Sequence, residues 1–199
     1  MGVTLAGCSS DVDPPKGASP FERSGSQTPA TVWAIGDAGH VGERERPVAR
    51  LIARAKPDHV LYLGDVYETG TAEEFEAYDD LYGPLASITS PTPGNHDWGA
   101  HEVGYDVYWA SRRATEPPSY YSFSLAGWDI ISLNSQIFGD EADKQTDWLR
   151  REVAAPGTCR LAFWHEPRFS AGTEHGDQPR VAPLWNALRG KAALVVNAR

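Results

Sequence analysis

The sequence predicts an α/β fold with α+β character, in which a parallel sheet covered by helices is followed by a second sheet. Two observations support this prediction. In the first half of the chain, short apolar runs alternate with segments of helical periodicity, which is the pattern of βαβαβ units and a parallel sheet. From residue 120 onward the pattern becomes that of a β-hairpin, which indicates the start of the second sheet.

The first half of the chain is expected to contain three strands and two helices. The strands are short runs of apolar and β-branched residues, and the first two end in the steps Gly36-Asp37 and Gly64-Asp65. The helices are indicated by apolar residues that recur every three to four positions, such as Phe75 and Tyr78. The expected strands are residues 30–35, 59–63 and 88–91, and the expected helices are 43–55 and 72–81.

The second half opens with two alternating runs joined by Ala126-Gly127, which is typical of a hairpin. A helix follows in which Trp148 and Leu149 are expected to face inward, and the next apolar run ends at His165. The expected strands are residues 120–125, 128–133, 161–164 and 192–196, and the expected helices are 144–153 and 181–188.

The N-terminal residues are expected to precede the folded domain. Leu5-Ala6-Gly7-Cys8 resembles the lipobox of bacterial lipoproteins, so residues 1–8 are interpreted as a lipoprotein signal remnant and Cys8 as the lipidation site. Met1–Thr4 supplies neither a charged nor a long apolar region, so either the true start lies upstream or the match arises by chance. Residues 9–30 predict a flexible tether, which leaves 31–199 as the domain. This layout predicts an extracytoplasmic protein, lipid-anchored at a bacterial membrane surface.

Composition and charge limit the partners of the protein. The 199 residues suit one domain or most of a larger one. The formal net charge is -9 without a basic run, which argues against a nucleic-acid backbone as partner. No run of about 18 apolar residues is present, so the lipid anchor is the one membrane contact expected. Cys159 is interpreted as a buried structural thiol, and the sequence gives no indication of the oligomeric state.

Polar residues follow the strands at positions where a metal site can form. Asp37, Asp65 and Asn95-His96 come directly after the first three strands, and His165 follows a later one. Because ligands bind outside the carboxyl ends of parallel strands, these side chains are expected at one rim. Carboxylate, amide and imidazole donors suit Fe, Zn or Mn. Each residue also has a structural interpretation, since aspartates after strands cap turns and helices, and a strand-end histidine is commonly hydrogen-bonded.

Four short blocks carry a resemblance to a known family. The chain contains, in order, Gly36-Asp37-Ala38-Gly39, Gly64-Asp65-Val66-Tyr67, Gly94-Asn95-His96-Asp97 and the later His165. These blocks resemble the successive motifs of calcineurin-like metallophosphoesterases, and the resemblance spans residues 31–197. A glycine at position 39, two residues after Asp37, resembles the motif of the purple acid phosphatase branch of that family. The resemblance implies a four-layer fold, in which two mixed β-sheets pack together and are flanked by helices.

The resemblance also implies an activity and a role for each residue. The activity is hydrolysis of a small phosphate ester by metal-activated hydroxide, with two divalent or trivalent ions (Fe, Zn or Mn) as cofactors. The implied ligands are Asp37 for the first ion, Asn95 and His165 for the second, and Asp65 as the bridge. His96 is implied to assist the leaving group, with Asp97 orienting its ring. Monoester, diester and nucleotide substrates share this core, so the substrate class is not distinguished.

Two departures from the family pattern are evident. The purple acid phosphatase branch carries a metal-binding tyrosine three positions after the second aspartate, where this chain has Glu68, preceded by Tyr67. Both are candidate ligands, although consecutive strand residues point to opposite faces and Tyr67 does not simply replace that tyrosine. The family's later Gly-His-x-His ligands are missing before Arg199, so the domain is expected to be C-terminally truncated. The alternative function is therefore a catalytically inactive remnant that binds metal or phosphate.

Two further interpretations concern the ligand of the protein. His175 lies in a polar, glycine-containing loop after His165 and is a candidate substrate-binding residue. A Rossmann-type nucleotide binder is a third class of function, but no Gly-x-Gly-x-x-Gly follows the first strand, which argues against that class.

Overall fold

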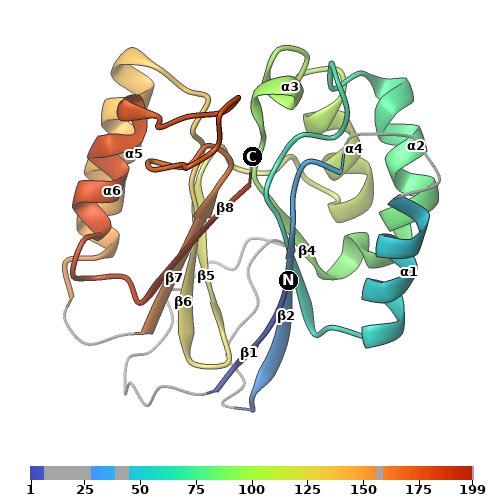
Figure 1. Ribbon diagram of the computed structural model, residues 1–199, viewed down its shortest axis with the longest axis horizontal. Coiled ribbons are helices and arrows are strands. Elements are labelled where there is room, and N and C mark those ends of the chain that lie inside the picture. The colour runs from blue at the N-terminus through green and yellow to red at the C-terminus, as the bar shows by residue number, and fades with distance from the viewer. Residues whose placement is uncertain (7–27, 39–44, 156–158, 199) are drawn as a thin grey trace.

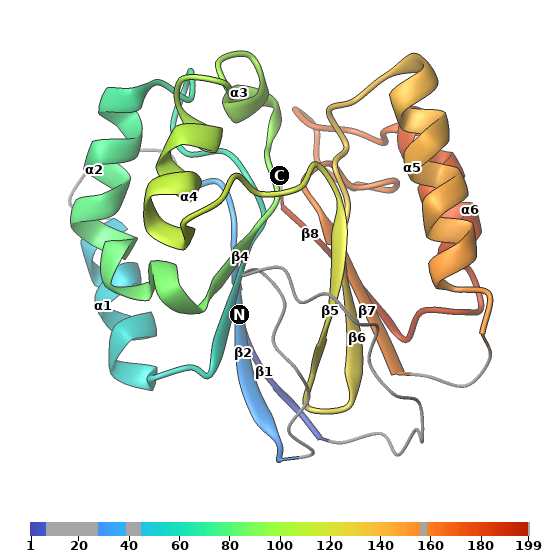
Figure 2. The ribbon, with the colours of Figure 1, turned by 180° about the vertical axis from the view of Figure 1, so that it is seen from behind.

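The computed structural model describes residues 1–6, 28–38, 45–155 and 159–198. They form two four-stranded sheets packed between two layers of helices (Figure 1). One layer contains α1 (Glu45–Ala55), α2 (Ala72–Tyr82) and α4 (Tyr105–Arg113), and the other contains α5 (Gly139–Glu152) and α6 (Ala182–Leu188) (Figure 2). Each sheet combines parallel and antiparallel pairs, so the predicted four-layer fold with two mixed sheets is confirmed. Among the described helices, none is long and apolar enough to cross a membrane.

The first sheet consists of one antiparallel and three parallel strands. Its order is β1 (Gly2–Leu5), β2 (Ala30–Ile35), β3 (His59–Tyr62) and β4 (Thr89–Pro91). The last three strands run parallel, as the βαβαβ pattern predicts. β1 was not expected, since the predicted domain begins at residue 31, but it pairs antiparallel with β2 and buries Leu5. The lipobox resemblance assigns residues 1–8 to a signal remnant, which is why no strand was expected there.

The helices of the first half are positioned by caps and by aromatic packing. Helix α2 starts in a capping box, in which Thr71 Oγ1 accepts the Glu74 N–H and the Glu74 carboxylate accepts the Thr71 N–H. The 3₁₀ helix η1 (Gly83–Ile88) then leads into β4. Helix α1 buries Ala49 and Ile52 against the sheet.

Helix α4 was not expected, although its sequence carries a helical pattern. Tyr105, Tyr108 and Trp109 recur at spacings of three and four residues and face Phe75 and Tyr78 of α2. Their ring centroids lie 5.0–6.4 Å apart, and Trp109 is fully buried in the core. Aromatic pairs at these distances stabilise a core beyond their buried area.

The second sheet begins with the predicted hairpin. Its order is β5 (Tyr121–Leu125), β6 (Trp128–Ser132), β7 (Cys159–Trp164) and β8 (Leu194–Asn197), with β5 and β6 antiparallel and the others parallel. Leu149 of α5 is fully buried, and Trp148 is partly buried against Tyr120, so both face inward as predicted. Cys159 is disulfide-bonded, which corrects its interpretation as a free thiol. Cys8 and residues 9–27 lie outside the described residues.

Hydrogen bonds join the two sheets near the carboxyl ends of their strands. The Tyr121 hydroxyl donates to the Pro91 carbonyl at 2.6 Å, and Thr92 Oγ1 donates to the Leu133 carbonyl at 2.6 Å. The short helix α3 (Asn95–Trp98) follows β4 at this end of the molecule (Figure 1). The polar residues that follow the strands of both sheets are therefore brought to one edge.

Candidate metal centre

The turns that carry the strand-end aspartates have an unusual backbone. Asp37 and Asp65 have φ angles of 51° and 61°, in the left-handed region that side chains other than glycine rarely adopt. Gly64 has φ 94°, and a Cβ there would lie 2.3 Å from the Gly94 nitrogen. A Cβ at Gly94 would lie 1.9 Å from the Asp65 carboxylate. Glycine is therefore required where the turns after β3 and β4 touch, and the strained backbone lies where the polar side chains converge.

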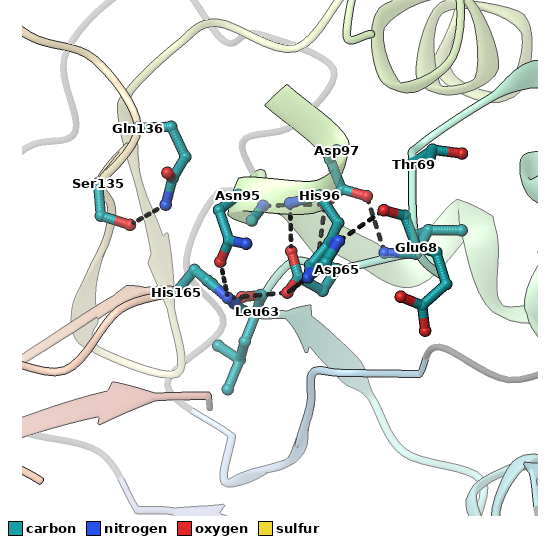
Figure 3. A network of polar contacts seen from close by, with 12 residues as sticks. Leu63, Asp65, Glu68, Thr69, Asn95, His96, Asp97, Ser135, Gln136 and His165 are labelled. Carbon is teal, nitrogen blue, oxygen red and sulfur yellow. Dashed lines mark hydrogen bonds and ion pairs between the residues drawn. The ribbon is translucent and has the colours of Figure 1, made fainter. Parts of the chain in front are cut away.

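The structure brings the four predicted metal-binding side chains together. Asp37, Asp65 and His165 each offer a ligand atom, and these atoms all lie within 4.8 Å of one another. The Asn95 amide oxygen lies 3.2 Å from His165 Nε2, as Figure 3 shows. The side chains that follow β2, β3, β4 and β7 therefore meet at one point, as their positions after the strands predict.

The environment of His165 is that of a cation-binding position. Its Nδ1 lies 2.9 Å from the Leu63 carbonyl and therefore donates to it, which leaves Nε2 facing the site. Nε2 lies 3.1 Å from the Asp65 carboxylate and 3.2 Å from the Asn95 oxygen, so two acceptors converge on one ring nitrogen. Burial lowers the pKa of His165, but the hydrogen bond and the charge of Asp65 outweigh it and raise the pKa above its ordinary value.

Asp65 is the central carboxylate of the cluster. One of its oxygens accepts the backbone N–H of His96 at 3.0 Å, and the other faces His165. Burial raises the pKa of Asp65, but the hydrogen bond and charge of His165 hold it below its ordinary value. The carboxylate is therefore kept ionised and oriented by groups from both sheets.

His96 lies at the open side of the cluster. Its Nδ1 is 2.6 Å from the Glu68 carbonyl, so this nitrogen carries the proton and Nε2 is directed toward the site, 3.9 Å from the Asp65 carboxylate. The side chain is 41% exposed, unlike the buried His165. It can therefore reach a bound ligand.

Asp97 does not orient the His96 ring, which corrects the role implied by the resemblance. Its fully buried carboxylate accepts the backbone N–H groups of Asp65 at 2.7 Å, Val66 at 2.7 Å and Gly94 at 2.9 Å. Burial raises the pKa of Asp97 to about 6, against the opposing effect of these N–H donors. Asp97 thus fixes the two turns that carry Asp65 and Asn95, and the Glu68 carbonyl holds the His96 ring.

The remaining candidate residues lie elsewhere. Tyr67 is buried in the hydrophobic core, and burial, followed by the charges of Glu45 and Glu74, raises the pKa of its hydroxyl. Glu68 is exposed, and it and His175 lie outside the group of ligand atoms that the described residues form. Figure 3 shows the Glu68 carboxylate pointing away from His165.

One part of the site was not anticipated from the sequence. The loop after β6 is held by Gln145 of α5, whose side-chain oxygen accepts the Asn134 N–H at 2.7 Å and whose amide donates to the Asn134 carbonyl at 2.9 Å. Ser135 and Gln136 then lie on the Asn95 side of the cluster (Figure 3). Gln145 holds the loop through backbone groups, and such hydrogen bonds leave no side-chain pattern from which the loop could be predicted.

The donor set fits a metal ion such as Mn, Zn or Fe. Two carboxylates, one amide oxygen and one imidazole are hard or borderline ligands, which these metals prefer. The histidine is fixed by a backbone carbonyl on its other nitrogen, as in most protein metal sites. The convergence of two acceptors on His165 Nε2 is the arrangement that a bound cation would stabilise.

Comparisons with known proteins place the chain among phosphoesterases. The calcineurin-like phosphoesterase family model matches residues 30–197. A probable cyclic nucleotide phosphodiesterase of Rhodococcus erythropolis is 29% identical over 163 residues, covering 68% of this chain and 48% of that protein. The 3',5'-cyclic adenosine monophosphate phosphodiesterase CpdA of Escherichia coli is 30% identical over 129 residues, covering 61% and 44%. The probable glycerophosphodiester phosphodiesterase GpdQ of Arcobacter nitrofigilis is 26% identical over 130 residues, covering 62% and 47%.

A solved structure shares the fold. GAP50, described as the anchor in the inner membrane complex of Plasmodium, superposes with a TM-score of 0.61 at 15% identity, covering 83% of this chain and 64% of that one. At this identity the likeness concerns the fold alone. The chain spans about half the length of the curated relatives it matches. Since the family model covers most of the chain, the protein belongs to the calcineurin-like phosphoesterase family.

Proposed function

We propose that this protein is a metal-dependent hydrolase of small phosphodiesters. The observation that carries the proposal is the convergence of Asp37, Asp65 and His165 within 4.8 Å, with Asn95 beside them. In this proposal Asp37, Asp65, Asn95 and His165 would hold two cations, with Asp37 available to the first, Asn95 and His165 to the second, and Asp65 to both. The bound ions would polarise a phosphoryl oxygen and lower the pKa of a water molecule.

The chain's own residues have distinct tasks in this proposal. Nδ1 of His96 donates to the Glu68 carbonyl, so the ring is held with Nε2 toward the substrate. With both ring nitrogens protonated, Nε2 would donate its proton to the leaving oxygen or hydrogen-bond to a non-bridging phosphate oxygen. Asp97 keeps the Asp65 and Asn95 turns in register through its backbone hydrogen bonds. Leu63 fixes His165 by accepting from its Nδ1.

The proposed substrate class is a phosphodiester rather than the monoester expected of an acid phosphatase. The relatives described above carry the names of cyclic nucleotide and glycerophosphodiester phosphodiesterases, which supports diesters. The position of the iron-binding tyrosine in purple acid phosphatases is occupied here by Glu68, and the adjacent tyrosine, Tyr67, packs in the hydrophobic core. We therefore favour divalent Mn or Zn over a tyrosine-bound iron.

A second candidate is a protein that binds metal or phosphate without turnover. It needs only the convergence of Asp37, Asp65, Asn95 and His165, which would support binding whether or not hydrolysis follows. The two candidates differ in catalysis and agree in binding, so both assays are needed.

The test combines calorimetric metal binding with hydrolysis of bis-p-nitrophenyl phosphate, p-nitrophenyl phosphate and cyclic AMP. We expect Mn²⁺ or Zn²⁺ binding and faster hydrolysis of the diesters, with both lost in Asp65→Ala. Asp177→Ala is the matched control, because Asp177 is exposed and bonds Ser170 of its own loop. Binding without hydrolysis would select the second candidate. Undiminished metal binding by Asp65→Ala would refute the site itself.

We also propose an extracytoplasmic location, which the disulfide at Cys159 supports because disulfides persist in oxidising compartments. Lipid attachment at Cys8 stays a prediction. Since the chain has two cysteines, a thioether-linked lipid at Cys8 and an intrachain disulfide at Cys159 cannot coexist. Intact mass before and after reduction distinguishes them, because the lipid adds the mass of acyl chains and reduction of the disulfide adds two hydrogen atoms.

A further inference from the structure

A buried carboxylate directly follows the candidate metal ligand of the second sheet. Glu166 comes after His165, and its side chain is 4% exposed. Its charge is paired with the guanidinium of Arg180, which comes from the 3₁₀ helix η2 (Pro179–Val181). A buried carboxylate with one cationic partner depends strongly on that partner, because removing the partner leaves an uncompensated charge.

The same guanidinium also binds the loop after β6. Arg180 Nη1 donates to the Ser135 carbonyl at 2.6 Å, and Nη2 lies 3.3 Å from the Gln136 side-chain oxygen. Its central carbon lies 4.9 Å from the ring centroid of Phe138, two residues further along. One side chain therefore joins Glu166 to three residues of this loop.

A second bond closes the connection on the other side. The backbone N–H of Glu166 donates to Ser135 Oγ at 3.3 Å, and Gln136 Nε2 donates to the same oxygen at 2.9 Å. The segment that carries His165 and the loop after β6 are thus tied together at two places, through the Glu166 N–H and through Arg180. Arg180 is not one of the residues that offer a ligand atom to the cluster described above.

We propose that Arg180 is a positioning residue for the metal centre, which holds His165 and the Ser135–Gln136 loop in place through Glu166. This inference rests on the metal site proposed above. The planar guanidinium is suited to the task because it presents several donors in a fixed geometry, which a lysine ammonium does not. Outer residues that orient metal ligands typically change metal affinity by about 10- to 100-fold when they are replaced.

The experiment measures Mn²⁺ and Zn²⁺ affinity by calorimetry, together with thermal unfolding of each variant. Arg180→Gln is expected to weaken metal binding about tenfold or more. Arg180→Lys keeps the positive charge but loses the fixed arrangement of guanidinium donors. This variant is therefore expected to fold and to bind metal more weakly than the wild type. Arg168→Gln is the matched control, because Arg168 pairs with Asp177 on its own loop and should leave the affinity unchanged.

The double variant Glu166→Gln/Arg180→Gln separates positioning from simple charge compensation. It removes both charges, but the Ser135 carbonyl still lacks its donor, so metal binding should remain weaker than in the wild type. Wild-type affinity in the double variant or in Arg180→Lys would overturn the proposal, whatever Arg180→Gln does to folding. If Asp65→Ala loses binding while the Arg180 variants do not, this inference fails and the proposed metal site stands.

Discussion

Replacing Asp97 tests whether this residue supports the site through the backbone. Its two carboxylate oxygens accept three backbone N–H groups, from Asp65, Val66 and Gly94. Asp97→Ala leaves all three donors without their acceptor in a region that is fully buried. Asp97→Asn replaces one oxygen by an amide group, which retains at most the two bonds made by Oδ2 and opposes the Val66 N–H.

The size of the effect follows from the number of orphaned donors. A buried donor without a partner costs about 1–3 kcal/mol. Two effects reduce the total for Asp97→Ala, since water can enter the vacated space and the cost of burying a carboxylate is relieved. We therefore expect Asp97→Ala to lower the free energy of unfolding by about 3–5 kcal/mol and Asp97→Asn by about 1–2 kcal/mol.

Urea unfolding followed by circular dichroism measures these differences. For a chain of this size each kcal/mol shifts Tm by roughly 2–4 °C, so the alanine variant should melt roughly 6–20 °C lower. Asp177→Asn is the control, because it removes one exposed acceptor of a single N–H. An Asp97→Ala protein within about 1 kcal/mol of the wild type would refute the assignment of Asp97 as the support of both turns.

The pH dependence of the metal-free protein gives a second signature of the same residue. The pKa of Asp97 is raised to about 6 in the folded state from 3.8, so the folded state binds this proton more tightly. The associated stability is present below the unfolded pKa and is lost as pH rises toward 6. In a chelator, the wild type should therefore lose stability between about pH 4 and 6 relative to Asp97→Asn. Parallel profiles of the two proteins would contradict this expectation.

Three further outcomes follow from the packing and from the site. Gly64→Ala should lower the free energy of unfolding by more than about 4 kcal/mol, because the new Cβ would collide with the backbone of the turn at Gly94. Gly190→Ala also places a side chain at a positive φ, but in open space, so it should lower the free energy of unfolding by about 1–2 kcal/mol. Urea unfolding midpoints compare the two variants. Burial raises the pKa of Tyr82 to about 12. The folded protein should therefore lose stability as pH rises from about 10 to 12, and tyrosinate absorbance should appear as it unfolds. Ionisation of Tyr82 without unfolding would contradict this expectation. Mn²⁺ at about 100 times its Kd should add about 2.7 kcal/mol to the wild type and nothing to Asp65→Ala, and equal Tm shifts in both would contradict the site.

The position of the site could be predicted from the sequence, because it depends on local patterns. Asp37, Asp65 and Asn95 each directly follow a recognisable apolar strand, and parallel strands bring such residues to one edge. His165 follows a later strand in the same way. The order of these steps along the chain, rather than any one of them, indicates a common site.

What the sequence could not predict depends on contacts between distant segments. The lipobox resemblance places residues 1–8 outside the domain, and the pairing of Leu5 with Ala30 is what shows that β1 belongs to the first sheet. The supports of the site, Asp97 and Arg180, bind mainly backbone groups or a residue far along the chain. Such partners carry no side-chain pattern of their own. The family resemblance, which compares side chains, implied instead that Asp97 orients the neighbouring His96 ring.

The structure places the candidate metal centre at the junction of the two sheets, which has a consequence for stability. Asp65 and Asn95 follow strands of the first sheet, whereas His165 follows a strand of the second. The bond from His165 to the Leu63 carbonyl crosses the junction, and the converging oxygens of Asp65 and Asn95 lie across it as well. A cation bound there would join the two sheets, because its ligands come from both. Metal binding and sheet packing are therefore coupled, so a variant that loosens the junction should weaken metal affinity even when every ligand is retained.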